Sequence, residues 1–453
     1  MNNINEIFSP LHLKTTILDL IDDEKRELAW KLIDHYYSKA YAMKHFDVLG
    51  YVAHKADKRD TYLKCAEAIY CLCENSEQLY IARANLYKAY NLMNYPEKAI
   101  FYIEKNLQMT PDDFETLCHK ASNLSLMGKK KESEELLEYV EKLYPEKKDK
   151  FDSGFSGKYL REGKTSKGLL SFLEAEIKEH SLFEKQLKMK KWNGVITPGK
   201  ILYVDACGGI GDQIINIRFF EKIKKYGMRP ILVSSDTKFY RDINSLLVRH
   251  GHEILTDKIL IDRTQKWTSM MTLPGYLGLK EHELWSGTYL TPLKNPKNKI
   301  PGIKPKIGIK CSGNPYFAQD EYRKIPIEKM LKILPKEADI FYIDEKPIDH
   351  PGVIDLSHMI NSWEDTLDII DQMDCIVSSC TSLVHAAAAI GKTTFVAVPI
   401  AEYYIWTTTK KDGSSPWHGN NLFVSRQTKV RDWEEPLNVI ENKLKDFLRI
   451  NYE

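Results

Sequence analysis

A glycine-rich turn that ends in an acid separates a short apolar run from an amphipathic stretch. The run is Ile201-Leu202-Tyr203-Val204, and the turn contains Gly209, Gly211 and Asp212. This order predicts a strand, a loop and a helix, with Asp212 at the helix N-terminus, where the helix dipole stabilises an ionised carboxylate. Such a carboxylate can accept a proton as a general base, or it can simply cap the helix. The turn is a poor dinucleotide fingerprint and has no P-loop Gly-Lys-Ser/Thr.

A second strand-to-helix junction carries hydroxyl groups. Residues 377–390 predict a strand that runs into a helix beginning near Thr381 and Ser382, with His385 and four alanines after it. Free N–H groups and hydroxyls at a helix start can bind an anion such as a diphosphate. Ser and Thr are also ordinary N-caps, and a single His is often a buried core residue. Both interpretations remain open from these residues alone.

The elements that would position these residues alternate between strands and helices. Apolar runs predict strands, and amphipathic stretches predict the helices between them, in the β-α-β order of parallel sheets. The strands are expected at 201–204, 230–233, 307–310, 339–343, 375–378 and 394–398, and the helices at 242–250, 328–334, 363–373, 382–390 and 433–448. A Pro- and Lys-rich linker, 295–306, divides them into two Rossmann-like domains, 191–298 and 299–453. Ligands are expected at the carboxyl ends of the strands.

Residues 1–190 predict an all-α array. A spacing of 34 relates Leu92 to Leu126, Ile103 to Leu137 and Pro111 to Pro145. Within 80–111 the large, small and Pro positions resemble the tetratricopeptide repeat, namely Leu86, Tyr90, Ala99, Ile103 and Pro111. About four such repeats are expected over residues 46–180. Their concave face would bind a polypeptide, or the array would be a spacer or a dimerisation surface.

Composition excludes several classes of protein. The chain has 453 residues, and 65 Lys and Arg against 63 Asp and Glu argue against a dedicated nucleic-acid binder. It contains no apolar run of about 18 residues and no signal-peptide pattern, so we expect a cytoplasmic protein without a membrane span. The 8 cysteines form no C-x-x-C pair, which argues against a disulfide framework and a zinc site.

Several segments together resemble bacterial tetratricopeptide-containing glycosyltransferases whose catalytic region is related to the heptosyltransferases. The resemblance covers about residues 190–435. Its segments are Trp192-x-Gly194, Pro198-Gly199-Lys200-Ile201-Leu202, Gly209-Ile210-Gly211-Asp212, Met271-Thr272-Leu273-Pro274, Ser312-Gly313-Asn314-Pro315, Arg323-Lys324-Ile325-Pro326, Thr381 with His385, Gly391-Lys392 and Ser415-Pro416-Trp417. Two positions depart from it: Cys207-Gly208 stands where many relatives carry Glu-Gln, and Cys380 stands where they carry an acid.

The resemblance implies a GT-B fold, with acceptor and base on the first Rossmann-like domain and a nucleotide sugar on the second. Asp212 matches the catalytic carboxylate, and transfer would invert the anomeric centre. The residues implied in donor and phosphate binding are Gly209, Gly211, Lys310, Ser312, Asn314, Arg323, Thr381, Ser382 and His385. Trp406 and Trp417 either stack on sugar or base or are buried loop residues. The absence of Asp-x-Asp from the sequence favours a reaction without a metal or another cofactor.

The sequence therefore predicts an inverting, metal-independent glycosyltransferase that moves a sugar from a nucleotide sugar to a protein acceptor selected by residues 46–180. One alternative is the same chemistry on a glycan or a lipid-linked saccharide. Another is a catalytically inactive repeat scaffold that keeps the fold as a binding module.

Overall fold

The computed structural model describes residues 10–22, 25–43, 46–180, 182–296, 299–315, 317 and 320–452. They form two compact units. The first unit comprises residues 1–145 and 314–322, and the second comprises 146–313 and 323–453. The expected domain boundary at residue 298 and the first residues of the chain lie outside the described residues. No described helix is both long and apolar enough to cross a membrane.

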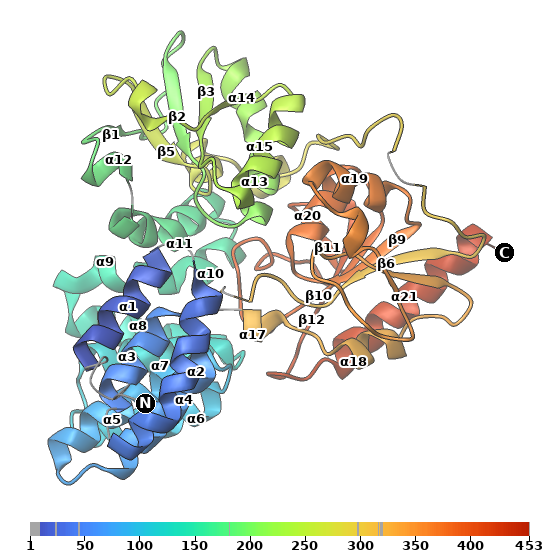
Figure 1. The fold of residues 1–453 in the computed structure, drawn as a ribbon. Coiled ribbons are helices and arrows are strands. Elements are labelled where there is room, and N and C mark those ends of the chain that lie inside the picture. The colour runs from blue at the N-terminus through green and yellow to red at the C-terminus, as the bar shows by residue number, and fades with distance from the viewer. Residues whose placement is uncertain are drawn as a thin grey trace, which may run out of the picture. The chain divides into compact units, whose positions relative to one another are not determined.

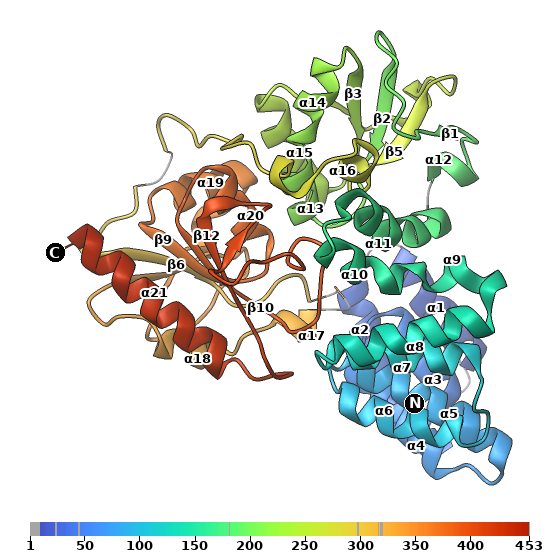
Figure 2. The same cartoon turned by 180° about the vertical axis from the view of Figure 1, so that it is seen from behind.

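The first unit is built from helices that pack in consecutive pairs, drawn in blue and cyan in Figures 1 and 2. Two helices, α1 (Pro10–Asp22) and α2 (Arg26–Met43), precede three hairpins. The hairpins are α3 (Phe46–Lys55) with α4 (Arg59–Cys71), α5 (Ser76–Leu92) with α6 (Pro96–Leu107), and α7 (Phe114–Leu126) with α8 (Lys130–Leu143). The expected helical N-terminal region is thus present, and its assignment to the tetratricopeptide class stays a prediction.

Each hairpin turns through one residue in the left-handed conformation. These residues are Asp57, Asn94 and Gly128, with φ of 56°, 58° and 77°. In each turn the next N–H donates to the carbonyl five residues back, at 2.8 to 2.9 Å, which is the Schellman pattern that ends a helix. Gly163 (φ 73°) and the bond from the N–H of Lys164 to Tyr159 repeat the turn in the second unit. The same local geometry therefore sets the direction of α4, α6, α8 and the helix that begins at Thr165.

Small side chains let the paired helices approach closely. Ala99 and Ile103 are fully buried in α6, and Leu86 is buried on the facing helix α5. Ser133 of α8 is buried too, and its Oγ donates to the carbonyl of Ala121 at 2.7 Å. Of the positions related by the 34-residue spacing, Ile103 and Leu137 are buried between the helices, whereas Pro111 and Pro145 are exposed in the connections.

A segment from the second half of the sequence belongs to the first unit. Arg59 Nη2 donates to the carbonyl of Phe317 at 2.5 Å, and Tyr322 Oη donates to the carbonyl of Asn91 at 2.6 Å. Asn94 Nδ2 also donates to the carbonyl of Glu321 at 3.3 Å. Residues 314–322 are thereby fastened to the hairpins.

Four short helices at the start of the second unit are α9 (Lys148–Phe151), α10 (Ser156–Arg161), α11 (Thr165–His180) and α12 (Leu182–Lys185). Leu160, Leu169 and Leu173 belong to the same apolar core as Trp192 and the first sheet. The sequence predicted one helical domain up to residue 190, whereas the compact units divide after Pro145. The physical reason is that the apolar sides of α10 and α11 are buried against the sheet-bearing region.

The first sheet has five parallel strands in the order β1-β5-β2-β3-β4. The strands are β1 (Lys190–Lys191), β2 (Ile201–Asp205), β3 (Arg229–Val233), β4 (Glu253–Leu255) and β5 (Lys266–Ser269). Its helices are α13 (Ile210–Asn216), α14 (Phe219–Lys225), α15 (Lys238–Arg249) and α16 (Leu273–Tyr276), with short 3-10 turns at Lys258–Leu260 and Glu281–Glu283. The strand order reverses between β2 and β5, so the glycine-rich turn after β2 lies at the switch point where parallel sheets bind ligands.

The second sheet has seven strands in the order β11-β12-β10-β9-β6-β7-β8, parallel except for the β11–β12 pair. The strands are β6 (Lys306–Lys310), β7 (Asp339–Tyr342), β8 (Ile354–Asp355), β9 (Cys375–Ser379), β10 (Thr394–Val398), β11 (Ser414–Ser415) and β12 (Gly419–Arg426). Its helices are α18 (Ile327–Lys332), α19 (Trp363–Asp371), α20 (Ser382–Ala389) and α21 (Glu434–Tyr452). The short helix α17 (Asp320–Arg323) begins in the first unit and ends in the second. This order reverses between β6 and β9, next to the start of α20.

Helices cover both faces of the second sheet. Val377 and Phe395 lie in the core that α21 covers, while Ile376 and Val396 point to the opposite core, which contains α20. Figure 2 shows α21 running along one face of this sheet. Two parallel-rich sheets, each with its own switch point, are consistent with the expected GT-B-like architecture.

Replacement of Ile103 by Ala should destabilise the helical hairpins. It leaves a cavity between α5 and α6, which costs about 2 to 5 kcal/mol of unfolding free energy. Phe101→Ala on the same helix is the matched control, because Phe101 is 56% exposed, and it should cost less than about 1 kcal/mol. Urea unfolding followed by far-ultraviolet circular dichroism measures the unfolding free energy of both variants. Equal losses would contradict the packing described here.

Candidate active site

The carboxylate of Asp212 accepts hydrogen bonds from two parts of the second unit. Its Oδ2 accepts the N–H of Gly209 at 2.9 Å, which closes the first turn of α13. Its Oδ1 accepts the hydroxyls of Tyr403 and Tyr404, each at 2.9 Å. Asp212 is therefore a helix cap, as one interpretation of the sequence held. It is also the acceptor of two phenols that follow strand β10.

The charge of this carboxylate is set by opposing effects. Asp212 is half-buried, and desolvation raises its pKa above the ordinary value. The Gly209 N–H, the two phenols and the positive charge of Arg323 act in the opposite direction. A carboxylate that is more basic than usual, yet held by donors that favour its ionised form, suits the acceptance of a proton.

The thiol beside the turn is a packed group. Cys207 Sγ lies 2.6 Å from Ser269 Oγ at the end of β5, on the other side of the switch point. Burial raises the pKa of the Cys207 thiol to about 11. It is therefore protonated near neutral pH and is a poor nucleophile.

Helices α13 and α20 meet at a glycine. A Cβ on Gly211 would lie 2.8 Å from Cδ2 of His385 and 3.4 Å from the Cα of Ser382. Thr381 is the buried N-cap residue of α20, and its side chain makes no capping hydrogen bond. The structure thus brings together four residues that the sequence analysis had singled out in two separate motifs, namely Gly211, Asp212, Ser382 and His385.

Arg323 supplies a positive charge to the same place. Its Nη1 donates to the carbonyl of Cys380, directly before the N-cap of α20, at 2.9 Å. Its charge lowers the pKa of both Asp212 and His385. The start of α20 therefore combines free backbone N–H groups with a guanidinium, which is the arrangement that binds phosphate.

Three other residues implied in donor binding lie at the end of strand β6 or after it, namely Lys310, Ser312 and Asn314. Lys310 Nζ forms a 2.5 Å ion pair with Asp344, so its charge is already balanced. Ser312 is half-buried in the loop after β6. Asn314 belongs to the first unit, because the segment it begins is bound to the helical hairpins.

The two tryptophans are core residues. Trp406 is 3% exposed, and its ring stacks on His385 and His418. Trp417 is 1% exposed and packs edge-on against Tyr404. Of the two alternatives left by the sequence, the structure supports burial, and neither ring presents an open face to a sugar or a base.

Sequence reasoning missed Arg218, which follows α13. It is buried, and its Nη1 donates to the carbonyl of Trp417 at 2.8 Å. The guanidinium carbon lies 5.1 to 5.7 Å from the centroids of four aromatic rings, those of Phe219, Trp285, Tyr289 and Trp417. Burial lowers the pKa of Arg218. The aromatic rings partly replace the acid that a buried guanidinium usually has.

Tyr403, Tyr404 and His418 were also missed. The only signal for the tyrosines was two adjacent hydroxyl-bearing aromatic residues just past the carboxyl end of a predicted strand. His418 directly follows Ser415-Pro416-Trp417, a segment quoted only for its resemblance.

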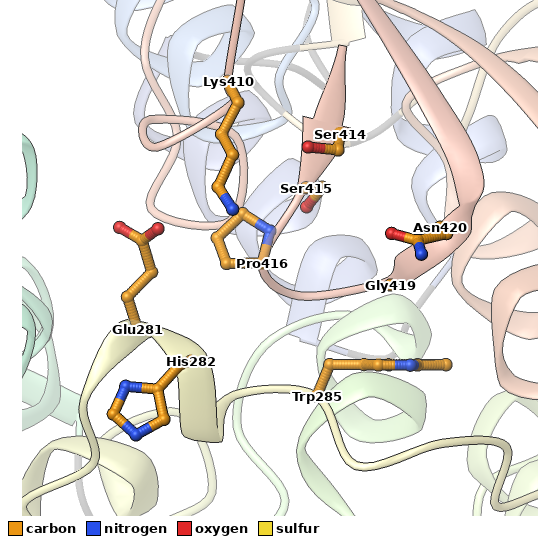
Figure 3. A pocket seen from close by; sticks show the side chains of 9 residues that line it. All are labelled: Glu281, His282, Trp285, Lys410, Ser414, Ser415, Pro416, Gly419 and Asn420. Carbon is orange, nitrogen blue, oxygen red and sulfur yellow. The ribbon is translucent and has the colours of Figure 1, made fainter. Parts of the chain in front are cut away.

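A cavity of about 210 Å³ is lined in part by Trp285 and Ser415. Figure 3 shows it between the segment that carries Glu281, His282 and Trp285 and the residues of the β11–β12 hairpin, with the ring of Trp285 seen edge-on. Among the described residues, no group of three His, Cys, Asp or Glu side chains could hold a metal ion.

Comparison with known proteins gives only distant structural likenesses. No family model and no curated protein matches the sequence. The iron-containing dodecameric glycosyltransferase TibC from enterotoxigenic E. coli H10407 has a TM-score of 0.37 and 11% identity, over 58% of this chain and 76% of that one. The E. coli ADP-heptose lipopolysaccharide heptosyltransferase II has a TM-score of 0.38 and 11% identity, over 56% of this chain and 100% of that one.

A longer match is a mutant of the Thermobaculum terrenum O-GlcNAc transferase, with a TM-score of 0.33 and 13% identity over 89% of this chain and 93% of that one. At these scores the likenesses establish no activity for this chain. Its function has to follow from the geometry of its own site.

Gly211→Ala should separate α13 from α20, because the added methyl group would lie 2.8 Å from His385. We expect a loss of about 1 to 3 kcal/mol of stability. Gly209→Ala is the matched control in the same turn. Its Cβ would meet nothing closer than 3.7 Å, and it should cost less than about 1 kcal/mol. Thermal unfolding of both variants measures the difference, and a Gly211→Ala protein as stable as the control would refute the close approach.

Proposed function

We propose that this chain is a glycosyltransferase that uses a nucleotide sugar, with Asp212 as the general base and the start of α20 as the binding site of the donor diphosphate. The observation that carries the proposal is the carboxylate of Asp212. It is half-buried at the switch point of the first sheet, and helix α13, which carries it, contacts the start of α20 at Gly211. A proton acceptor thus adjoins an anion site, as sugar transfer from a diphosphate requires.

The proposed reaction is a direct displacement. Asp212 takes the proton of an acceptor hydroxyl while that oxygen attacks the anomeric carbon of the donor. The bond from the anomeric carbon to the diphosphate oxygen breaks, and the nucleoside diphosphate leaves with the electron pair. Attack from the face opposite the leaving group inverts the anomeric centre.

The leaving diphosphate gains negative charge in this step. We infer that Arg323 and the N–H groups of the first turn of α20 stabilise that charge, in the way that preorganised donors stabilise developing anions. Arg323 is fixed by its bond to the carbonyl of Cys380, so its position costs no reorganisation during transfer. The proposed mechanism assigns no role to a metal ion.

We further propose that the acceptor is a polypeptide selected by residues 46–180. The hairpins of the first unit keep large apolar side chains at the surface, including Ile81 (55% exposed), Phe101 (56%) and Tyr139 (46%). Stacked helical hairpins present extended surfaces that commonly hold a segment of another protein. A hydroxyl on a small saccharide would not need them.

Asp212→Asn should abolish most transfer without removing the donor site. The amide still accepts the two phenols through its oxygen but cannot take a proton at neutral pH. Transfer from a radiolabelled nucleotide sugar to polypeptide acceptors should fall by about a hundredfold or more, with donor affinity nearly unchanged.

Asp257→Asn is the matched control, because Asp257 caps a 3-10 turn through the N–H of Ile259 and has no role in the proposed site. It should retain normal turnover. If Asp212→Asn behaves like this control, Asp212 is only a cap.

Arg323→Gln should weaken donor binding. It removes the charge next to the start of α20, and the lost charge-assisted contact should reduce affinity for a nucleoside diphosphate by about 10- to 150-fold. Titration calorimetry with ADP, GDP and UDP measures this affinity. Arg229→Gln, an exposed arginine paired with Glu253 on the first sheet, serves as the control for loss of charge. Equal affinity in the wild type and Arg323→Gln would remove the proposed diphosphate site.

A further inference from the structure

A row of buried side-chain hydrogen bonds runs from the β11–β12 hairpin to helix α20. Ser415 Oγ lies 3.0 Å from Nδ1 of His418, and Nε2 of His418 lies 2.9 Å from Nδ1 of His385. All three residues are less than 10% exposed. Ser415 also lines the cavity of Figure 3, whereas His385 contacts the turn of Asp212 at Gly211.

The direction of these hydrogen bonds follows from Ser415. Its Oγ accepts the backbone N–H of Trp417 at 3.3 Å, and its own hydrogen has one acceptor in the described residues, Nδ1 of His418. His418 must then carry its proton on Nε2 and donate it to Nδ1 of His385. This leaves His385 with its proton on Nε2. The reverse direction would leave the buried hydroxyl hydrogen of Ser415 without an acceptor, which costs about 1 to 3 kcal/mol.

Both imidazoles stay neutral. Burial, and then the charges of Arg218 and Arg323, lower the pKa of His385 to about 3. Burial, His385 and Arg218 hold the pKa of His418 well below its ordinary value. A neutral ring donates from one nitrogen and accepts at the other, so the chain of bonds fixes which nitrogen of His385 is the donor. His385 can therefore donate a hydrogen bond but cannot take up a proton near neutral pH.

The free nitrogen of His385 faces the proposed site. Nε2 lies 3.4 Å from the position of a Cβ on Gly211, and it has no hydrogen-bond partner among the described residues. His385 retains 7% exposure, and the neighbouring charges are those of Arg218 and Arg323. An N–H in this place, with Arg323 beside it, suits an anionic oxygen and not a cation.

We propose that Ser415 and His418 are positioning residues that hold His385 in its neutral tautomer with the proton on Nε2, and that this N–H donates a hydrogen bond to a phosphate oxygen of the nucleotide sugar. The identity of the ligand rests on the proposed function, whereas the tautomer does not. No proton is transferred in this contact.

A purely structural role for the three residues predicts something different. The rings of His385, His418 and Trp406 stack with interplanar angles of 11° to 16°, and such packing does not depend on which nitrogen carries the proton. The tautomer of His385 is therefore the measurement that separates positioning from packing.

Nitrogen-15 NMR of the histidine side chains in the full chain measures that tautomer, with His385→Gln used to assign the resonances. In the wild type we expect a protonated Nε2 and an unprotonated Nδ1 for His385, unchanged between pH 5 and 8. Ser415→Ala removes the hydroxyl that sets the direction and should produce a mixture of tautomers. A wild-type His385 that is charged at neutral pH, or protonated on Nδ1, overturns the proposal, and so does a Ser415→Ala protein with an unchanged tautomer.

Binding of ADP, GDP and UDP by calorimetry tests the ligand. His418→Phe keeps a flat ring but cannot donate to His385, and we expect affinity to fall by about 2- to 12-fold, the equivalent of one hydrogen bond. His418→Gln places an amide N–H at a similar reach and should restore affinity to within about twofold of the wild type. Ser415→Ala, the smaller change, supports the same comparison if the Phe variant does not fold.

The outcomes separate this inference from the proposed function. Suppose that Arg323→Gln weakens nucleotide binding, whereas Ser415→Ala shifts the His385 tautomer without weakening it. His385 then makes no contact with the donor, and only the present inference falls. If no nucleoside diphosphate binds the wild type, the proposed donor site and this contact both fall, while the NMR result still decides the positioning role of Ser415 and His418.

Discussion

The hydrogen bonds to one half-buried carboxylate connect the two sheets of the second unit. Asp212 belongs to a helix of the first sheet, and two of its three donors, Tyr403 and Tyr404, follow a strand of the second. Desolvation of a carboxylate costs several kcal/mol unless charge-assisted hydrogen bonds offset it. The contact therefore persists only while both sheets hold their places. The same bonds favour the ionised form of the acid and connect the two switch points.

A second constraint is steric. Because Gly211 has no side chain, α13 can lie against the first turn of α20 and bring His385 beside the carboxylate's own turn. The groups around this contact are two neutral histidines and two positively charged arginines. Arg218 is surrounded by aromatic rings, and Arg323 donates to a backbone carbonyl. Apart from Asp212, the charged groups described here at the contact are positive.

The helical hairpins of the first unit depend on local geometry instead of on contacts between distant residues. Each one is set by local geometry, a left-handed residue and a Schellman bond, and each buries small and large apolar side chains against its neighbour. The loop after β6 enters this first unit at Asn314 and leaves it at Tyr322, bound through Arg59 and Asn91. Residues 314–322, which connect Gly313 to Arg323 in the sequence, are thus part of the hairpin unit.

The sequence by itself determined the features that depend on neighbouring residues. Strands such as β2, β9 and β10 are continuous apolar runs because parallel strands are buried on both faces, and the hairpin period and the placement of Asp212 at a helix start are equally local. Strands β5 and β12 mix polar and apolar residues, so no such run marks them. Only the tertiary structure decided that Tyr403 and Tyr404 hold Asp212, that Asp344 neutralises Lys310, and that His418 orients His385. These are contacts between residues distant along the chain, and they form when separate strands and helices pack, which no local pattern of residues encodes.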